Sequence, residues 1–347
     1  MYLCASTVDG ASFQQRLEAA SAGGYAGIGL RPSHYQAARA EGRSETDVRR
    51  MLEAHGLELT EIGFLADWWE TGDLAARSRA HEEQLYRLKE SLGGRHMILI
   101  GGPLRAPVDL VAERFAAVCD RAGDRGLLVG LEFLPWTDTA DAGLAWQIAQ
   151  ASGRRNGGVV LDTWHHFRGA ADNDLIRAIP ADRVVAIQFS DGERQRVGTD
   201  LEDTFKRRRL PGEGEFDLQS FVTTVTGMGV TAPVGVEVLS EELRKLGPQE
   251  SARRAAAATR QVLAAAGPGP SLVPNTPAPG TIPFRAPDLL RDCLRRNFTC
   301  PTGPCTGPGS WPRPGRPWLW CSARSAGSAT TSAARPRRSP ACRPCPR

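Results

Sequence analysis

Four side chains that can bind a hard metal ion stand at or next to the ends of four short apolar segments. The side chains are Glu132, Asp162, Gln188 and Glu237, and the segments read GLLVGLEF, GGVVLDTWH, RVVAIQFSD and APVGVEV. Carboxylate and amide oxygens of this kind suit Mg²⁺ or Mn²⁺. If the segments lie side by side with their ends together, the four oxygens converge on one ion.

The four segments have the composition of buried parallel strands. Each is rich in Val, Ile or Leu and is followed by a loop and a helical pattern. The same alternation runs through the preceding part of the chain. Strands are expected at 2–7, 25–30, 58–64, 96–100, 127–133, 158–162, 184–189 and 234–238, and helices at 12–22, 47–54, 81–92, 108–122, 140–151, 172–179, 216–228 and 251–265.

Eight strand–helix units in about 266 residues predict an α/β fold of the (β/α)8 TIM-barrel type. The alternation alone also permits a doubly wound sheet. The barrel is favoured because the candidate ligands fall on consecutive strands five to eight. An open sheet would spread those strand ends along a line too long to share one ion. No Gly-x-Gly-x-x-Gly turn follows an early strand, so a nucleotide-binding fold is unsupported.

Residues 267–347 differ in composition from residues 1–266. They hold twelve Arg, no Lys and two Asp, a net charge of +10 against −6 for the rest of the chain. They also hold 17 of the 25 prolines and six of the eight cysteines. Such a segment buries too little apolar surface to offset its ordering entropy. We therefore predict a barrel over 1–266 and a low-complexity, disordered tail over 267–347, a composition that a frame change in GC-rich DNA also produces.

The composition excludes several kinds of partner. A mildly acidic barrel argues against a nucleic-acid-binding groove. No apolar run of about 18 residues and no charged-then-apolar leader is present, which predicts a cytoplasmic enzyme with no membrane partner. The first 266 residues hold only Cys4 and Cys119, so no disulfide framework is expected. The tail cysteines lack a histidine and a standard zinc spacing. A homo-oligomer stays open.

The motifs around the candidate ligands resemble a known superfamily. LEFLPW, LDTWHHFRG, IQFSDG, RRLPGEGEFDL and GVEVLS, in this order, look like the xylose-isomerase-like TIM barrels over roughly residues 1–266. That group includes sugar isomerases and epimerases, hydroxypyruvate isomerase, inosose dehydratase and 3-dehydroshikimate dehydratase. The resemblance implies a TIM barrel with a divalent ion, Mn²⁺ or Mg²⁺, and a small sugar, polyol or keto-acid substrate.

The resemblance also implies a role for each motif residue. Glu132 and Glu237 would bind the ion and flank the substrate, one removing a proton beside a carbonyl and the other returning it. The ion would stabilise the enediolate that forms. Asp162 would be a further ligand, as would Gln188, which replaces the histidine of the ketose-epimerase branch and makes the site harder. His165 would hydrogen-bond substrate oxygens.

Arg208 precedes Pro211 in RRLPGEG, which resembles the family's Arg-x-x-Pro-Gly-x-Gly loop, whose arginine reaches the substrate. A guanidinium can bind a carboxylate or vicinal oxygens with two hydrogen bonds. Arg207 and Arg209 leave the choice among the three arginines open. Gly212 and Gly214 are interpreted as backbone devices for a tight turn.

Other residues near these motifs receive structural interpretations. His166 is taken as a surface loop histidine, and Trp164 as either a pocket wall or a packing residue. Glu61, placed at the end of the third strand near the mouth of the barrel, is interpreted as a structural residue, with a pocket-lining role as the alternative. Asp138, Trp68 and Trp69 are likewise assigned no role in the chemistry, although a second acid or a sugar-stacking surface is conceivable there.

The leading functional prediction is a metal-dependent isomerase or epimerase that acts through an enediolate. The alternative is a dehydratase of the 3-dehydroshikimate or inosose type, in which the same proton abstraction is followed by loss of a β-hydroxyl group. A histidine-rich trinuclear zinc site, as in the DNA-repair endonuclease branch, is disfavoured because only His165 and His166 lie near the ligand set. A non-catalytic barrel would be favoured only if one ligand were missing.

Overall fold

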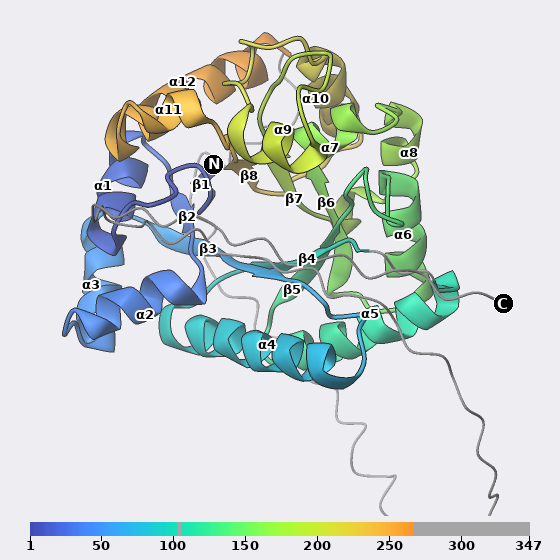
Figure 1. Ribbon diagram of the computed structural model, residues 1–347, viewed down its shortest axis with the longest axis horizontal. Helices are drawn as coiled ribbons and strands as arrows, with labels where there is room; N and C mark the ends of the chain where they lie inside the picture. The colour runs from blue at the N-terminus through green and yellow to red at the C-terminus, as the bar shows by residue number, and fades with distance from the viewer. Residues whose placement is uncertain (103–105, 267–347) are drawn as a thin grey trace, which may run out of the picture. The chain divides into compact units, whose positions relative to one another are not determined.

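The structure is a computed structural model that describes residues 1–102 and 106–266. Eight parallel strands follow one another in chain order, and the eighth pairs with the first to close a barrel. Figure 1 shows the strands at the centre of a ring of helices. The strands are β1 (Tyr2–Leu3), β2 (Gly27–Gly29), β3 (Glu58–Leu65), β4 (His96–Ile100), β5 (Leu128–Glu132), β6 (Gly157–Asp162), β7 (Val184–Phe189) and β8 (Val234–Val236).

The TIM barrel predicted from the sequence is confirmed. For every strand, at least one end lies within two residues of the end expected from the sequence. The helices are α1 (Phe13–Ala22), α2 (Pro32–Ala40), α3 (Glu45–Ala54), α4 (Gly72–Leu92), α5 (Val108–Gly123), α6 (Ala142–Ala151), α7 (Thr163–Arg168), α8 (Asn173–Arg177), α9 (Asp200–Lys206), α10 (Leu218–Gly227), α11 (Glu241–Arg244) and α12 (Pro248–Ala265), with a short 3₁₀ turn at Ala181–Arg183.

Four helices were not expected from the sequence: α2, α7, α9 and α11. Three of them are only four to seven residues long, too short to show a hydrophobic period. The sequence nevertheless contains residues that cap the starts of these helices. Thr199 and Glu202 form a capping box at the start of α9, and Asp162 caps α7 through the backbone N–H of Trp164. The segment after β7, taken as one long loop, is therefore partly helical.

Alternation along the strands sorts side chains between the barrel interior and the surrounding helices. Met97 and Leu99 on β4 join the large apolar cluster, while Ile98 joins Val160 and Ala186 in a separate one. Asp162 comes two residues after Val160, and Gln188 two residues after Ala186. Both polar side chains therefore continue the inner columns toward the carboxyl ends of their strands.

Close packing inside the barrel requires a glycine at one strand position in particular. A Cβ atom on Gly235 of β8 would lie 2.4 Å from Cζ of Tyr2 and 2.7 Å from Sγ of Cys4. Any larger residue would displace the Tyr2 ring, which reaches across the barrel to Glu61.

Two further predictions concern the C-terminal tail and membrane-spanning helices. The tail predicted over 267–347, with its cysteines, lies outside the described residues, so the domain boundary at 266 stays a prediction. Among the helices of the described ranges, none combines the length and the hydropathy needed to cross a membrane.

Candidate metal centre

The strand register brings the carboxyl ends of β5 to β8 together. Glu132 is the last residue of β5, and Asp162, the last of β6, pairs directly with Gln188 on β7. Gln188 pairs in turn with Gly235 of β8, and Glu237 follows that strand with its backbone N–H donating to the Phe189 carbonyl at 2.9 Å. The four predicted ligands thus lie at one edge of the barrel, the place where TIM-barrel active sites form.

Three side chains come close enough to hold one ion. One ligand atom each from Glu132, Asp162 and His165 lies within 4.8 Å of the other two, and all three side chains are buried. Nε2 of His165 is 3.5 Å from Oδ2 of Asp162 and 3.8 Å from Oε1 of Glu132. His165 therefore lies at ligand distance, whereas the sequence predicted it only as a substrate-binding residue. It stands on α7 rather than in a loop.

The side-chain amide oxygen of Gln188 is buried and accepts no hydrogen bond from the described residues. Its side chain is 2% exposed, and its Oε1 has no hydrogen-bond partner among the described residues. A buried carbonyl oxygen without a donor is costly unless something else binds it. Gln188 pairs with Asp162 in the sheet, and two carboxylates, an imidazole and an amide oxygen together are a donor set that fits a divalent cation.

Arg208 contacts two of the predicted ligands, Asp162 and Glu237. Its Nη1 donates to Oδ2 of Asp162 at 2.9 Å and lies 3.3 Å from Oε2 of Glu237. Its side chain is buried, whereas Arg207 and Arg209 on either side are exposed. The sequence left open which of the three arginines faces the predicted ligands. Arg208 is the one that contacts them.

The carboxylates crowd together in a buried space, and their pKa values respond. Burial raises the pKa of Glu132 well above its usual range, and the charges of Asp162 and Glu237 raise it further. Burial also raises the pKa values of Asp162 and Glu237, but the Arg208 guanidinium opposes both shifts. Burial, with Arg208 nearby, lowers the pKa of His165 well below its usual value, so the imidazole is neutral.

A backbone cradle around Asp191 holds the Pro-Gly-Glu-Gly loop beside the site. Its carboxylate accepts the backbone N–H groups of Gly192, Gly212, Gly214 and Phe216 at 2.8 to 3.1 Å. Gly212 has φ +84°, and a Cβ on Gly214 would lie 2.3 Å from Oδ1 of Asp191. Both glycines therefore serve the turn, as interpreted from the sequence.

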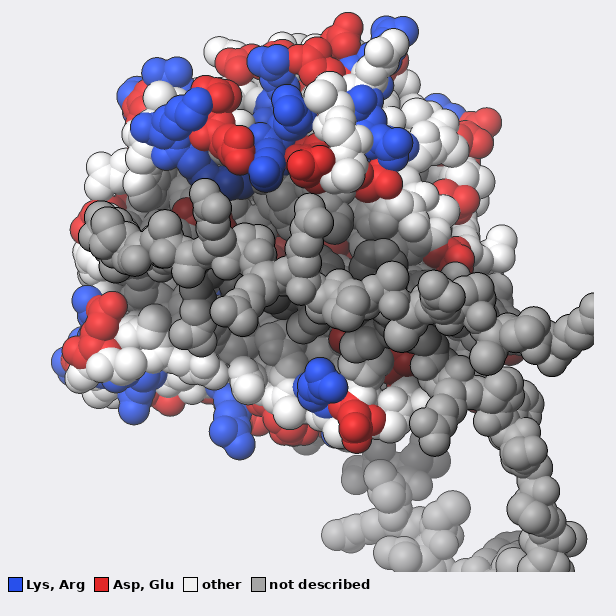
Figure 2. Space-filling model, viewed as in Figure 1, with Lys and Arg blue, Asp and Glu red and all other residues white. Residues whose placement is uncertain are grey.

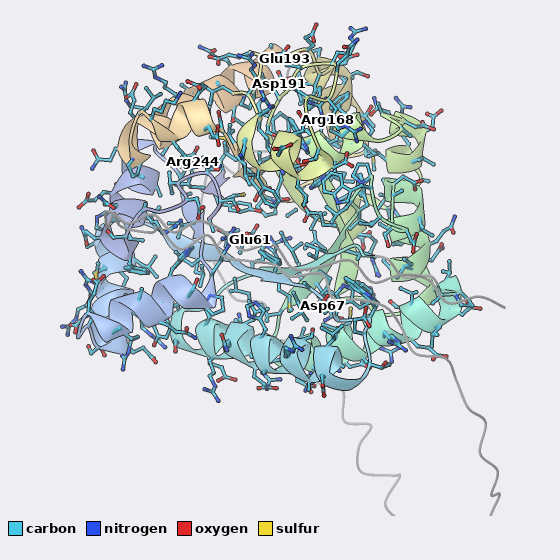
Figure 3. The ribbon with its side chains drawn as sticks, in the orientation of Figure 1. Glu61, Asp67, Arg168, Asp191, Glu193 and Arg244 are labelled. Carbon is cyan, nitrogen blue, oxygen red and sulfur yellow. The ribbon has the colours of Figure 1, made fainter. Side chains whose placement is uncertain are left out.

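The same loop region carries a second set of paired charges. Arg168 donates to Oδ2 of Asp203 at 2.7 Å and to the Glu193 carbonyl at 2.6 Å, and its guanidinium stacks 4.3 Å from the Trp164 ring centroid. Figure 3 shows Arg168, Asp191 and Glu193 gathered near α9 and α10, with Glu61 near the middle of the ring of helices. The ion pair between Arg168 and Asp203 holds α7 against α9.

A cavity of about 420 Å³ opens next to the candidate centre. Its wall includes Trp136, whose ring meets the His165 imidazole edge-on at 5.3 Å. The cavity is large enough for a small ring-shaped molecule. Its lining residues are Pro135, Trp136, Arg168, Arg196, Asp200, Asp203 and Thr204.

Glu61 was placed wrongly from the sequence. It lies midway along β3 rather than at its end, and it is 5% exposed. Its Oε2 accepts the Tyr2 hydroxyl at 3.0 Å and the Gln188 amide at 3.4 Å. Burial, with the charge of Glu237, raises the pKa of Glu61 to about 7. Its position in the middle of the expected strand 58–64 was the available signal.

Arg31 is a residue near the site that the sequence analysis missed. It follows β2 and donates to Oγ of Ser6 at 2.7 Å. The Ser6 hydroxyl in turn hydrogen-bonds Glu237, so Arg31 and a predicted ligand share one partner. The position of Arg31 directly after the expected strand 25–30 was the available signal.

The remaining candidates divide clearly. The interpretation of His166 as a surface residue is wrong, because it is buried against Phe221 and Phe167. Trp68 and Trp164 are packing residues: the first donates to the Ile100 carbonyl at 3.0 Å, and the second donates to Thr204 at 3.1 Å.

Trp69 is also buried, in edge-on contact with the Trp68 ring. Asp138 lies exposed in the segment after β5.

A sequence model of the family described as xylose isomerase-like TIM barrel matches residues 17–262. A 3-dehydroshikimate dehydratase of Pseudomonas aeruginosa is 26% identical over 66% of this chain and 36% of its own length. An inosose isomerase of Halalkalibacterium halodurans is 30% identical over 40% of this chain and 49% of its own length. This chain thus spans less than half of either relative.

Among solved structures, the IolI protein with a bound zinc atom superimposes with a TM-score of 0.69 at 17% identity. The superposition covers 77% of this chain and 98% of that protein. At that identity the likeness supports the fold.

Proposed function

The chain belongs to the xylose isomerase-like TIM-barrel family, and from that premise we propose that it is a divalent-metal-dependent isomerase or epimerase of a small sugar, polyol or keto-acid. The observation that carries the proposal is the buried group of Glu132, Asp162 and His165 beside the unpartnered oxygen of Gln188. Buried carboxylates at such distances repel one another, and a cation removes that repulsion.

We assign metal binding to Glu132, Asp162, Gln188 and Glu237, with Mn²⁺ or Mg²⁺ as the ion. A bound divalent ion would polarise a substrate carbonyl and so make the neighbouring C–H bond more acidic. His165 also lies at ligand distance, and its imidazole would favour a softer ion such as Zn²⁺. The choice among the three ions is therefore part of the test.

Glu132 and Glu237 carry the proton transfers in this proposal. Either carboxylate can remove the proton beside the carbonyl, and the other can return one to the neighbouring carbon. Their surroundings differ: Glu237 lies beside Arg208 and Ser6, whereas Glu132 lies mainly among other acids. We assign to Arg208 and to neutral His165 the hydrogen bonds to substrate oxygens.

A dehydratase is the second candidate, and one relative favours it. The 3-dehydroshikimate dehydratase of P. aeruginosa is similar to this chain over 66% of its residues. Dehydration begins with the same proton abstraction, and loss of a β-hydroxyl group then replaces reprotonation. Both reactions use the same residues, so the substrate decides between them.

We further propose that the partner is a small molecule, neither a nucleic acid nor a membrane, and that the enzyme is cytoplasmic. On the face drawn in Figure 2, acidic and basic side chains are intermixed along the upper rim, without a broad basic surface among the residues described there. A mixed surface of this kind lacks the electrostatic footprint of a nucleic-acid-binding protein.

The test is turnover of the full chain in D₂O, followed by NMR, with added Mn²⁺, Mg²⁺ or Zn²⁺ and a panel of ketoses, inososes and 3-dehydroshikimate. Deuterium entering beside the carbonyl of an isomeric product is the expected result. Loss of one molecule of water from the substrate, without return of the proton to the same carbon, would establish the dehydratase. The control is Glu53→Gln, the same change at an exposed position on α3, which must leave turnover unchanged. Activity that survives complete metal removal would overturn the metal-dependent assignment.

A further inference from the structure

The side-chain amide of Gln188 is held by hydrogen bonds at one end. Its nitrogen donates to Oε2 of Glu61 at 3.4 Å and to Sγ of Cys4 at 3.9 Å. Its oxygen has no partner among the described residues, although it is fully enclosed. The two ends of the amide therefore meet different surroundings, with acceptors around the nitrogen and no donor near the oxygen.

Glu61 is itself fixed in position. The Tyr2 hydroxyl donates to the same Oε2 at 3.0 Å, and both side chains are buried inside the barrel. The Tyr2 ring packs against Gly235, where no Cβ atom would fit. Glu61 stands in the middle of β3, whose neighbours β2 and β4 pair with it on both sides. Its carboxylate therefore has little freedom to move away from Gln188.

An ionised carboxylate offers acceptors and no donor. Facing Glu61, the Gln188 amide gains a hydrogen bond when its NH₂ group points inward. In the flipped orientation two acceptor oxygens would oppose each other in a buried space, which costs free energy. Glu61 thus distinguishes two amide orientations of nearly equal shape, and only the observed one leaves an oxygen that can bind a cation.

We infer that Glu61, held by the Tyr2 hydroxyl, is a positioning residue that orients Gln188 so that its amide oxygen serves the metal centre. The inference rests on the proposed function, in which Gln188 is a ligand. Glu61 does not touch the ion or the substrate in this assignment. Outer partners that orient metal ligands commonly contribute about 10- to 100-fold to metal affinity, and an effect of that size is expected here.

The test is Mn²⁺ affinity of the full chain, measured from the electron paramagnetic resonance signal of free Mn²⁺ at pH 8. Glu61→Leu removes the acceptor and is expected to raise the Mn²⁺ dissociation constant by about 10- to 100-fold. Glu61→Gln keeps an acceptor oxygen and should stay near the wild-type value. Tyr2→Phe, which frees Glu61 without removing it, should give a smaller loss of about threefold, the lower end of what one hydrogen bond contributes.

A double-variant cycle shows whether Glu61 acts through Gln188. Gln188→Met keeps the size of the side chain and removes both amide atoms. In the Gln188→Met background, Glu61→Leu should cause no additional loss of Mn²⁺ affinity. Equal losses in the two backgrounds would overturn the inference, because Glu61 would then act independently of the amide.

Failure of the inference can be separated from failure of the proposed function. If Gln188→Met leaves Mn²⁺ affinity unchanged, Gln188 is not a ligand and both are wrong at this residue. If Gln188→Met weakens binding and Glu61→Leu does not, only the inference is wrong. Should Glu61→Leu fail to fold, as judged by circular dichroism, Tyr2→Phe takes its place in the cycle and must meet the same condition.

Discussion

Two buried glutamates in this protein meet opposite surroundings. Glu82 on α4, 1% exposed, accepts two hydrogen bonds from Arg121 at 2.7 and 2.9 Å, one from Tyr86 and an ion pair from Arg79 at 2.7 Å. Glu132, 7% exposed at the end of β5, has other acids as its main charged neighbours.

The pKa values follow the partners. Burial alone would raise the pKa of Glu82, but the hydrogen bonds from Arg121 and Tyr86 lower it overall. At Glu132, burial and the neighbouring carboxylates act in the same direction, and the pKa rises. Burial by itself therefore does not identify a functional carboxylate. A buried acid whose acceptors are all used holds two helices together, whereas a buried acid without compensation marks a place where a ligand belongs.

The largest expected effect tests the mouth of the barrel. Glu132→Gln and Glu237→Gln should each lower kcat by about a thousandfold or more, because each removes both a ligand and a proton-transfer group. Circular dichroism should show that both variants fold. Wild-type turnover in either one would contradict the assigned pair.

The second effect tests the helix contact. Glu82→Gln should lower the free energy of unfolding by about 2 kcal/mol, since it weakens the charged hydrogen bonds to Arg121 and Arg79, whose side chains are 30% and 45% exposed and stay accessible to water. Urea unfolding measures the loss, and kcat of the folded enzyme should be unchanged. A Glu82→Gln variant with full stability and reduced activity would contradict the distinction drawn between Glu82 and Glu132. Glu83→Gln, one residue away on the exposed side of α4, is the matched control.

A third prediction concerns His96, buried on β4 with both ring nitrogens lacking a hydrogen bond among the described residues. Burial, with the charge of Arg95, lowers its pKa to about 3, while Tyr2 meets the ring edge-on and Glu61 lies 3.9 Å away. A depressed pKa stabilises the fold above the unfolded value, near 6.5, and this stability is lost as the pH falls toward 3.

His96→Leu should therefore flatten the acid side of the stability profile. The difference between the variant and the wild type should change by about 2 kcal/mol between pH 7 and pH 5 in favour of the variant. Urea unfolding at several pH values measures it. Parallel profiles for the two proteins would show that His96 is charged or hydrogen-bonded in the folded state.

The smallest expected effect concerns residues 267–347, whose composition predicts no packed core. Removing them should change kcat by less than about twofold, within the scatter of a substitution remote from the site. The assay is turnover of the 1–266 chain beside the full chain with the same metal. A chain of 1–266 that cannot fold or turn over would show that these residues take part in the enzyme.

The amino-acid sequence by itself determined the barrel and suggested which side chains serve as candidate ligands. Strand composition, the count of eight repeats and the polar residue at the end of each apolar segment are local features, so they can be read without knowing contacts. The four predicted ligands stand at one edge of the barrel because parallel strands in register put their carboxyl ends together.

Only the tertiary structure decided which neighbours those residues have. Arg208 is buried between two exposed arginines, His166 is enclosed rather than exposed, and Glu61 from β3 reaches Gln188 from β7 across the barrel. Short helices such as α7 and α9 could not be predicted either, because they are too short to show a hydrophobic period. The physical reason is the same in each case: burial, pKa and hydrogen-bond satisfaction depend on groups distant in the chain, and these meet only when the barrel closes.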